Sequence, residues 1–290
     1  MERSRFLVET SWLAEHLHDP NVRIVDMRGY VRTVEHDGVQ EASYVGARVE
    51  YEQGHIPGAV YIDWSSDIVD PGETVKAQIA PAERFARLME RLGIGDKHLV
   101  VAYDAHPASQ FATRLWWALN YYGHDLVVVL NGGLPKWQRE HRPLVDTIPA
   151  YPPATFTPVA QPRLRATAED VLAMLSQQGI KLVDARDTGQ YTGKIVRDHG
   201  RPGHIPGAIN IPREEMINPA DGTFRSSEEL SQLFASAGVK PEEQVVAYCN
   251  GGVAATTVLF SLAMLGFPRL TNYDGSWNEW GTRNDLPVEL

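Results

Sequence analysis

Residues 245–256 read VVAYCNGGVAAT. Apolar residues lead to Cys249, Gly251 and Gly252 follow, and a glycine-free run then extends to Leu265. This order predicts a buried strand, a tight turn and a helix. A thiol at that junction faces backbone N–H groups and the positive end of a helix dipole, which both favour the nucleophilic thiolate. Cys249 is therefore a candidate nucleophile, and a buried structural thiol is the alternative.

The same alternation of strand and helix continues on both sides of this stretch. Strands over 180–184, 208–210, 244–248 and 269–272 alternate with helices over 167–177, 227–237 and 253–265. Thr167 with Asp170, and Ser226 with Glu229, have the spacing of helix N-terminal capping boxes. Uninterrupted apolar strands followed by helices indicate a parallel sheet covered on both faces. Ligands of such sheets bind beyond the carboxyl ends of the strands, which is where Cys249 falls.

The chain contains its motifs twice, in the same order. Four pairs of motifs carry the repeat: VRIVDMR at 22–28 with IKLVDAR at 180–186, GHIPGAV at 54–60 with GHIPGAI at 203–209, VVAYD at 100–104 with VVAYC at 245–249, and NGGLPKW at 131–137 with YDGSWNEW at 273–280. Their separation drifts slowly, which predicts duplication of a whole domain with insertions in loops. The proline-rich stretch between the copies favours extended backbone. We therefore expect a domain over 1–142, a semi-rigid linker over 143–165 and a second domain over 166–290.

Composition excludes several classes of protein. The net charge is −10 and no basic run is present, so neither nucleic acid nor an anionic membrane is an expected partner. Cys249 is the single cysteine, which rules out an internal disulfide and a multi-cysteine zinc site. The histidines show no ligand pair at i, i+4 with a carboxylate, so we expect no metal and no other cofactor. The chain has neither a signal-peptide pattern nor an apolar run of about 18 residues, which predicts a cytoplasmic protein.

Taken together, the ordered motifs resemble the rhodanese superfamily in its tandem form, the thiosulfate and 3-mercaptopyruvate sulfurtransferases. The resemblance covers nearly the whole chain and rests on the VDAR strand end, GHIPGA, the Tyr-Cys turn and YDGSWNEW. It implies an α/β fold of two tandem rhodanese-like domains, each a mostly parallel sheet with helices on both faces. It also implies that only the second domain is catalytic, because Asp104 stands in the first copy where the second has Cys249.

The resemblance further implies a persulfide mechanism. The Cys249 thiolate takes a sulfane sulfur from a small-molecule donor, thiosulfate or 3-mercaptopyruvate, and an acceptor (cyanide, a thiol or reduced thioredoxin) then removes it. The N–H groups of the turn would surround this sulfur and stabilise its negative charge. The turn consists of Asn250, Gly251, Gly252, Val253 and Ala254.

Residues upstream of the turn are candidates for binding the donor. Mercaptopyruvate-type members use two arginines there; Arg197 matches the second, whereas Gln190 occupies the position of the first. Lys194 is a nearby cation that can compensate. Arg186 ends a strand, where a structural ion pair with Asp184 is the alternative to contact with the substrate.

The two residues after Cys249 leave the identity of the donor open. Thiosulfate-type members often carry cationic residues there, and mercaptopyruvate-type members carry Gly-Ser. Asn250 and Gly251 match neither pattern. The uncharged, glycine-rich turn is closer to the mercaptopyruvate type.

Two other functions compete with this interpretation. A related cysteine phosphatase of the Cdc25 type needs an arginine six positions after the cysteine to clamp phosphate, and Ala255 stands at that position. Phosphatase activity is therefore not expected. A non-catalytic rhodanese-like sulfur carrier or binding module keeps the same thiolate, and steady-state turnover distinguishes it from an enzyme.

The first copy differs from the second around its turn. His106, Pro107 and Ser109 replace the glycine-rich sequence, and we expect no anion-binding nest beside Asp104. We expect Arg114, on the helical segment that follows, to lie at a domain interface or in the core.

Overall fold

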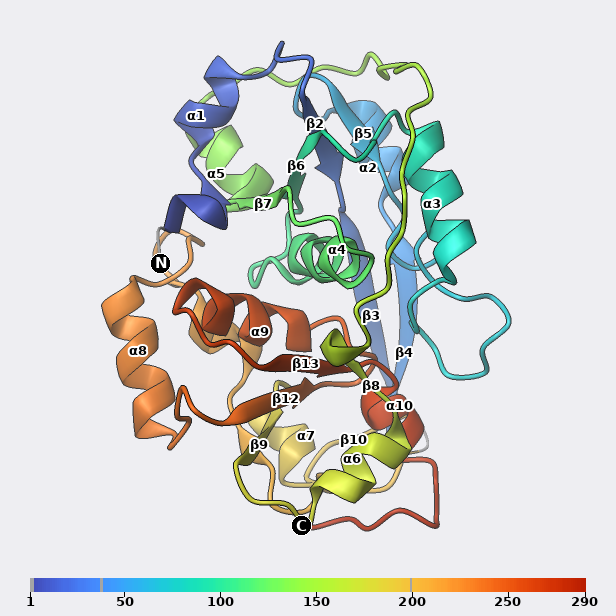
Figure 1. The fold of residues 1–290 in the computed structure, drawn as a ribbon, viewed down its shortest axis with the longest axis vertical. Coiled ribbons are helices and arrows are strands. Elements are labelled where there is room, and N and C mark those ends of the chain that lie inside the picture. The colour runs from blue at the N-terminus through green and yellow to red at the C-terminus, as the bar shows by residue number, and fades with distance from the viewer. Residues whose placement is uncertain (1–2, 37–38, 199) are drawn as a thin grey trace.

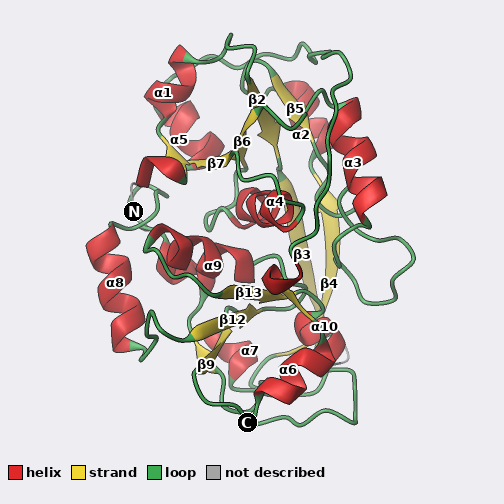
Figure 2. Cartoon of the chain, viewed as in Figure 1, coloured by secondary structure: helices red, strands yellow, loops and turns green. Residues whose placement is uncertain are grey.

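The computed structural model describes residues 3–36, 39–198 and 200–290 of the chain (Figure 1). It contains two five-stranded sheets, one in each half of the chain, and a three-stranded sheet that joins them. Figure 2 shows helices around both large sheets. In the described ranges, no helix combines the length and the apolar character needed to span a membrane.

The first large sheet contains parallel strands with helices on both faces. Its order is β1 (Leu7–Val8), β7 (Val127–Leu130), β6 (Leu99–Tyr103), β2 (Val22–Asp26) and β5 (Ala59–Tyr61). The side chains of successive strand residues are buried on opposite faces of the sheet, because a pleated strand points them alternately to each side. One face packs against α3 (Ala82–Arg91) and α4 (Gln110–Tyr121), and the other against α1 (Thr10–Glu15) and α5 (Gly133–Arg139). The short α2 (Arg48–Gln53) precedes β5.

The second large sheet repeats this arrangement. Its order is β8 (Arg165–Ala166), β13 (Leu270–Tyr273), β12 (Gln244–Tyr248), β9 (Ile180–Asp184) and β11 (Ile209–Asn210), again with parallel pairs. One face packs against α8 (Ser227–Ser236) and α9 (Ala255–Met264), and the other against α6 (Ala168–Met174) and α10 (Ser276–Trp280). The remaining short elements are α7 (Thr188–Tyr191) and the 3-10 helices η1 (Arg3–Arg5), η2 (Pro162–Leu164) and η3 (Arg213–Met216).

The prediction of a duplicated α/β fold is confirmed by the matching strand order of the two sheets. The elements predicted for the second copy are present with ends shifted by a few residues. Both predicted capping boxes are also present, at Thr167 with Asp170 and at Ser226 with Glu229. In each box the hydroxyl accepts from the backbone N–H three residues on, and the carboxylate accepts from the cap N–H, so both helix starts are satisfied locally.

A hairpin from the first half reaches across to the second half. The hairpin consists of β3 (Gly29–His36) and β4 (Val39–Gly46), and β10 (Val196–Arg197) pairs in parallel with β4. Figure 1 shows β3 and β4 extending from the first large sheet toward α10. Asp198 reinforces the junction, because its N–H donates to the Gln40 carbonyl and its carboxylate accepts from the Ala42 N–H at 2.8 Å. Residues 196–197 are therefore a strand held by the other half of the chain.

The two halves also share one hydrophobic core. Buried residues of α4 and α9 belong to the same cluster, and the two helices lie between the large sheets in Figure 1. Hydroxyl groups join them inside this core: Thr113 lies 2.9 Å from the Thr256 hydroxyl and 3.2 Å from that of Thr257. This contact brings the amino-terminal turns of α4 and α9 close to each other.

The stretch predicted as a linker contains no helix or strand over 146–161, then forms η2 and enters β8, and it is hydrogen-bonded to both halves. Val159 donates its N–H to the Tyr122 carbonyl, and Tyr151 donates its hydroxyl to the Gly58 carbonyl at 2.8 Å. Further along, the Thr271 hydroxyl donates to the Arg163 carbonyl at 2.9 Å. The stretch therefore contacts residues of both halves.

Candidate active site

Cys249 lies directly after β12, at the carboxyl edge of the second large sheet. Its exposed fraction is 3%. The Cys249 N–H donates to the Ser276 hydroxyl at 3.1 Å, and its carbonyl accepts from the Trp277 N–H at 3.0 Å. Since β12 pairs with β9 on one side and β13 on the other, the backbone at Cys249 has little freedom to move. The sequence expectation of a strand end followed by a turn and a helix is confirmed.

The turn after Cys249 presents a row of free backbone donors. The N–H groups of residues 250–254 donate to no protein acceptor within the described part of the chain. Gly252 has φ of +67°, and a Cβ there would come within 2.7 Å of the Asp274 carbonyl, so only glycine fits. Consecutive amides at a turn that opens a helix form an anion-binding concavity. The turn can therefore stabilise negative charge next to the thiol.

A buried arginine from the first half holds this turn. Arg114 of α4 donates to the Gly252 carbonyl at 3.1 Å and to the Ala77 carbonyl at 2.8 Å, and it pairs with the Asp274 carboxylate at 2.8 Å. Asn272 donates a second hydrogen bond to the Gly252 carbonyl at 2.9 Å. Arg114 is thus the interface residue that we expected, and it also supports the backbone of the turn.

Cys249 opens into a cavity of about 250 Å³ that both halves of the chain line. Most of the residues predicted for the site lie around it: Gln190, Arg197, Cys249, Asn250, Gly251, Val253 and Ala254. The first half contributes residues from the hairpin, from the segment after β5 and from the loop before α4 and the first residue of α4: Val31, Thr33, Gln40, Tyr44, Trp64, His106 and Gln110. The cavity is small, so a ligand in it would be a small molecule in contact with several of these groups at once.

Part of the Arg197 guanidinium forms no hydrogen bond with the described residues. Its side chain is 9% exposed, and Nε lies 3.6 Å from an oxygen of Asp198. Among the described residues, neither Nε nor Nη2 has a hydrogen-bond partner. The guanidinium lies 5.9 Å from the centre of the Tyr44 ring. Arg197 therefore has donors to offer to a ligand in the cavity.

Gln190 is in the cavity wall but is already bonded. Its Oε1 accepts from the Asn250 side-chain amide at 2.9 Å. The Asn250 carbonyl in turn accepts from the Asn278 N–H at 2.8 Å. Gln190 therefore orients the first residue of the turn and brings no positive charge.

Three predicted residues, Arg186, Lys194 and Gly252, are not among the lining residues of the cavity. Arg186 is buried and donates to both oxygens of Asp184 and to the Gly203 carbonyl, which matches the structural alternative. Lys194 is exposed and is not among the lining residues. Gly252 contributes to the turn through its backbone, since its carbonyl accepts a hydrogen bond from Arg114.

Sequence reasoning missed Arg213 and the residues of the first half that line the cavity. Burial, with Arg213 nearby, lowers the pKa of His106 to about 3, so this imidazole is neutral at ordinary pH. Burial raises the pKa of Tyr44, whose hydroxyl oxygen accepts from the Asn278 amide at 3.1 Å. Arg213 follows β11. Because ligands bind beyond the carboxyl ends of parallel strands, this position could have marked Arg213 as a candidate site residue. No sequence signal marks the hairpin residues, because they reach the cavity only through the fold.

The first copy does contain an anion nest, contrary to the sequence expectation. The Asp104 carboxylate occupies it and accepts from the N–H groups of His106, Phe111 and Ala112 at 2.8–2.9 Å. The turn needs no glycine because the side chain itself fills the space in front of the α4 amides. Burial raises the pKa of Asp104 to about 7, although the three N–H bonds favour the charged form.

We expect Asp104→Asn to remove a pH-dependent part of the stability. Because the folded pKa of about 7 lies above the ordinary value, the folded protein keeps a proton that the unfolded chain loses between about pH 4 and pH 7. The free energy of unfolding of the wild type therefore falls as pH rises through that window, by about 2–4 kcal/mol. The variant lacks this titration. Urea unfolding at about pH 5 and about pH 8 measures the difference, and parallel profiles of the two proteins would contradict a raised pKa.

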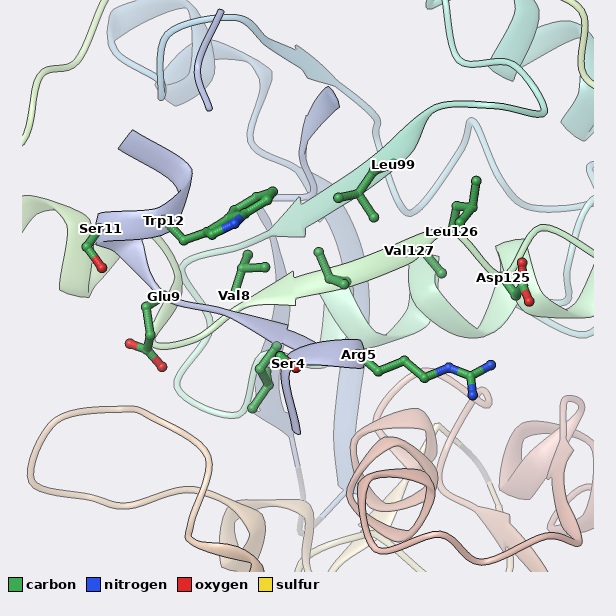
Figure 3. Close-up of a pocket in the computed structure, with 12 residues that line it drawn as sticks. Ser4, Arg5, Val8, Glu9, Ser11, Trp12, Leu99, Asp125, Leu126 and Val127 are labelled. Carbon is green, nitrogen blue, oxygen red and sulfur yellow. The ribbon is translucent and has the colours of Figure 1, made fainter. Parts of the chain in front are cut away.

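A second cavity, of about 640 Å³, lies at the edge of the first large sheet (Figure 3). Trp12, Val8 and Leu99 give it an apolar centre, and Glu9 and Asp125 stand at its margins. Cys249 is not among its lining residues. Within the described ranges, no group of three or more His, Cys, Asp or Glu side chains is arranged to hold a metal ion. The smaller cavity is the candidate active site because it contains the thiol.

Comparison with known proteins supports the duplication of the domain and a function in sulfur transfer. The sequence pattern of the family described as Rhodanese-like domain matches residues 9–140 and 167–283. A sulfur carrier protein, TtuD of Thermus thermophilus, is 38% identical over 97% of this chain and 95% of its own. The 3-mercaptopyruvate sulfurtransferase of Escherichia coli is 35% identical over 98% of each chain. A putative thiosulfate sulfurtransferase of Mycobacterium bovis is 35% identical over 100% of this chain and 99% of its own.

A solved structure agrees with these relatives. The crystal structure of SseA from Escherichia coli, described under the rhodanese fold and catalytic mechanism of 3-mercaptopyruvate sulfotransferases, superposes with a TM-score of 0.82. It shares 31% identity and covers 94% of this chain and 98% of its own. The agreement therefore extends over both halves of the chain.

Proposed function

The chain belongs to the family of rhodanese-like domain proteins and is a sulfurtransferase, and on that premise we propose that Cys249 carries the transferred sulfur as a persulfide. Its substrates are a small-molecule sulfur donor and an acceptor. The observation that carries the proposal is that Cys249 lines a small cavity and directly precedes a turn with five backbone N–H groups that have no protein acceptor in the described chain. Such a turn stabilises the thiolate, the persulfide and the charge that develops between them.

In the first half of the reaction, the Cys249 thiolate attacks the transferable sulfur of the donor, which is the outer sulfur of thiosulfate or the thiol sulfur of 3-mercaptopyruvate. With thiosulfate, the S–S bond breaks and its electron pair leaves with sulfite. With 3-mercaptopyruvate, the C–S bond breaks and the electron pair leaves as the enolate of pyruvate, which then takes up a proton. Both routes leave one extra sulfur on Cys249.

In the second half, a nucleophile attacks the outer sulfur of the persulfide and the Cys249 thiolate leaves. Cyanide gives thiocyanate, and a thiol, reduced thioredoxin included, gives a persulfide of the acceptor. This is a double-displacement scheme with a covalent intermediate. Because it needs reduced thiols, we propose a reducing compartment such as the cytoplasm.

We also propose a division of labour along the chain. Residues 166–290 form the catalytic domain, 143–165 the linker and 1–142 a non-catalytic domain. Asp104 supports this division, because its carboxylate fills the nest that lies in front of α4 and cannot carry sulfur. The first domain contributes the hairpin and Arg114 to the site instead. Asp104→Asn should therefore leave turnover within about twofold of the wild type.

A sulfur carrier is the second candidate, because one relative with 38% identity is named as such. A carrier is loaded once and then delivers its sulfur to a partner, whereas an enzyme turns over. Parallel steady-state assays with thiosulfate and 3-mercaptopyruvate, each with cyanide or dithiothreitol as acceptor, distinguish the two. Mass spectrometry after exposure to donor should show one added sulfur on the protein. Stoichiometric loading without turnover would favour the carrier, and no loading by either donor would contradict both functions.

Arg197→Ala is expected to lower kcat/KM for the donor by about ten- to a hundredfold. The guanidinium has buried N–H donors without partners among the described residues, and it lines the cavity of Cys249. A charged group that grips the donor contributes to binding before and during the reaction, so the loss should appear mostly in KM. We expect a larger loss with 3-mercaptopyruvate, whose carboxylate can accept two parallel hydrogen bonds.

Arg201→Ala is the matched control for this prediction. Arg201 lies close to Arg197 in the sequence but donates to the carbonyls of Trp280 and Leu286, away from the cavity lining. It should lose stability without a specific rise in KM. Wild-type kinetics of Arg197→Ala with both donors would remove Arg197 from the proposed site.

A further inference from the structure

The cavity of Cys249 contains a second arginine, Arg213, at the start of η3. The Arg213 N–H donates to the Ala185 carbonyl at 3.3 Å, which ties its backbone to the end of β9. The side chain is 23% exposed, and Nη2 pairs with Glu214 at 2.7 Å. Nε is buried and has no hydrogen-bond partner in the described part of the chain. The Nη2 of this guanidinium is therefore engaged in an ion pair with an exposed carboxylate, whereas its buried Nε–H is available to a ligand.

The topology explains why Arg213 lines the same cavity as Cys249. Strands β11, β9 and β12 are parallel neighbours, so their carboxyl ends lie along one edge. Arg213 follows β11, Gln190 follows β9 and Cys249 follows β12. Arg197 comes from a different direction, on β10 and against the hairpin of the first half. Two guanidiniums thus line the cavity from separate elements.

The carboxylates that pair with these two arginines, Asp198 and Glu214, are not among the lining residues of the cavity. Asp187 is the single acidic residue among the described lining residues. One of its carboxylate oxygens accepts a hydrogen bond from the Gln190 N–H at 3.0 Å. Gln190 is bonded to Asn250 and contributes no charge. His106 is neutral, because burial and Arg213 hold its pKa down to about 3. Buried N–H donors without acceptors cost free energy, and an anionic ligand would supply the acceptors.

We propose that Arg213 and Arg197 together bind the oxyanion of the sulfur donor, and that Arg213 supplies the second cation that the position of Gln190 lacks. This inference rests on the persulfide chemistry proposed for Cys249. The ligand is a small molecule with a sulfonate or carboxylate group on one side and the transferable sulfur on the other. The sulfur faces the backbone N–H groups of the turn, and the oxyanion faces the guanidiniums. A cavity of about 250 Å³ accommodates a molecule of this size.

Arg213→Gln tests the proposal, since it removes the charge while keeping a polar side chain. We expect kcat/KM for the donor to fall by about ten- to a hundredfold, mostly through KM, with both thiosulfate and 3-mercaptopyruvate. Arg213→Lys should recover part of the loss, because a point charge replaces the fork of donors. The decay of a preformed persulfide with dithiothreitol, an uncharged acceptor, should stay within about twofold of the wild type.

Glu214→Gln is the matched control. Glu214 is exposed, pairs with Arg213 and is not among the lining residues of the cavity. If Arg213 binds the donor, Glu214→Gln should keep wild-type KM values. If Glu214→Gln loses as much as Arg213→Gln, the ion pair is structural and the proposal is wrong. Wild-type kinetics of Arg213→Gln with both donors would also overturn it.

A binding measurement separates this inference from the proposed function. Calorimetry with thiosulfate on the unreactive Cys249→Ser protein, with and without Arg213→Gln, does not depend on turnover. We expect Kd to rise by about ten- to a hundredfold when Arg213 is replaced. An unchanged Kd overturns the arginine pair even if the wild-type enzyme transfers sulfur. A weakened Kd supports the pair even if the persulfide is absent from the wild type.

Discussion

Cys249→Ser is expected to abolish sulfur transfer, with kcat lower by at least about a thousandfold. A serine hydroxyl is a much weaker nucleophile than a thiolate at neutral pH and cannot form a persulfide. The turn and the cavity should remain, because the hydrogen bonds at this position involve the backbone N–H and carbonyl of residue 249. Steady-state assays with both donors and intact-protein mass spectrometry measure the effect. The variant should show no added sulfur after exposure to donor.

Thermal unfolding provides the control for this variant, whose transition should stay within a few degrees of the wild type. The substitution changes one buried atom and leaves the surrounding packing in place. A variant that unfolds much earlier would point to loss of structure instead of loss of the nucleophile. A variant that keeps a substantial fraction of turnover would contradict Cys249 as the sulfur carrier.

Arg114→Met is expected to destabilise the protein by about 3–5 kcal/mol. Arg114 is fully buried, and its loss leaves the buried Asp274 with Arg165 as its remaining arginine partner, at 3.2 Å. The Gly252 carbonyl also loses one of its two donors. Because that carbonyl belongs to the turn after Cys249, we expect kcat to fall at temperatures where the variant is still folded. Urea unfolding and the kcat of the folded variant measure the two effects.

Arg23→Met is the matched control for Arg114→Met. Arg23 is also buried and donates to carbonyls, including that of Gly93 at 2.8 Å, but it does not contact the turn. It should reduce stability without a comparable fall in kcat. Arg114→Lys, which keeps the charge, should recover part of the stability and less of the turnover. If both Arg114 variants keep wild-type kcat when folded, Arg114 does not position the turn.

The sequence was most informative where a structural signal is local. Alternating strands and helices, the capping residues at Thr167 and Ser226, and the turn after Cys249 each depend on neighbours within a few positions. The repeated motifs extended these local signals to a duplicated α/β fold, and the matching strand orders agree with it. The placement of the thiol at a strand end follows from the same patterns.

The sequence was less informative where a side chain acts through distant partners. The stretch with Arg197 has no strand pattern of its own, and β10 forms only because β4 of the other half offers unpaired backbone groups. The expectation of no nest beside Asp104 was wrong because it considered glycine alone, whereas a carboxylate can fill the space in front of a helix. Lys194 was proposed from its proximity in sequence, yet it is exposed and outside the cavity lining.

By itself, the sequence therefore determined the fold class and the duplication and pointed to Cys249 as the candidate nucleophile, because strand and helix periods and turn residues are encoded in short segments. Only the tertiary structure decided which charged groups surround that nucleophile. Arg213 and Arg197 line the same cavity because parallel strands end at a common edge and a hairpin crosses between the halves. Arg114 reaches the Gly252 carbonyl because α4 packs on α9. Such contacts depend on the packing of whole elements, which no short segment of the chain specifies.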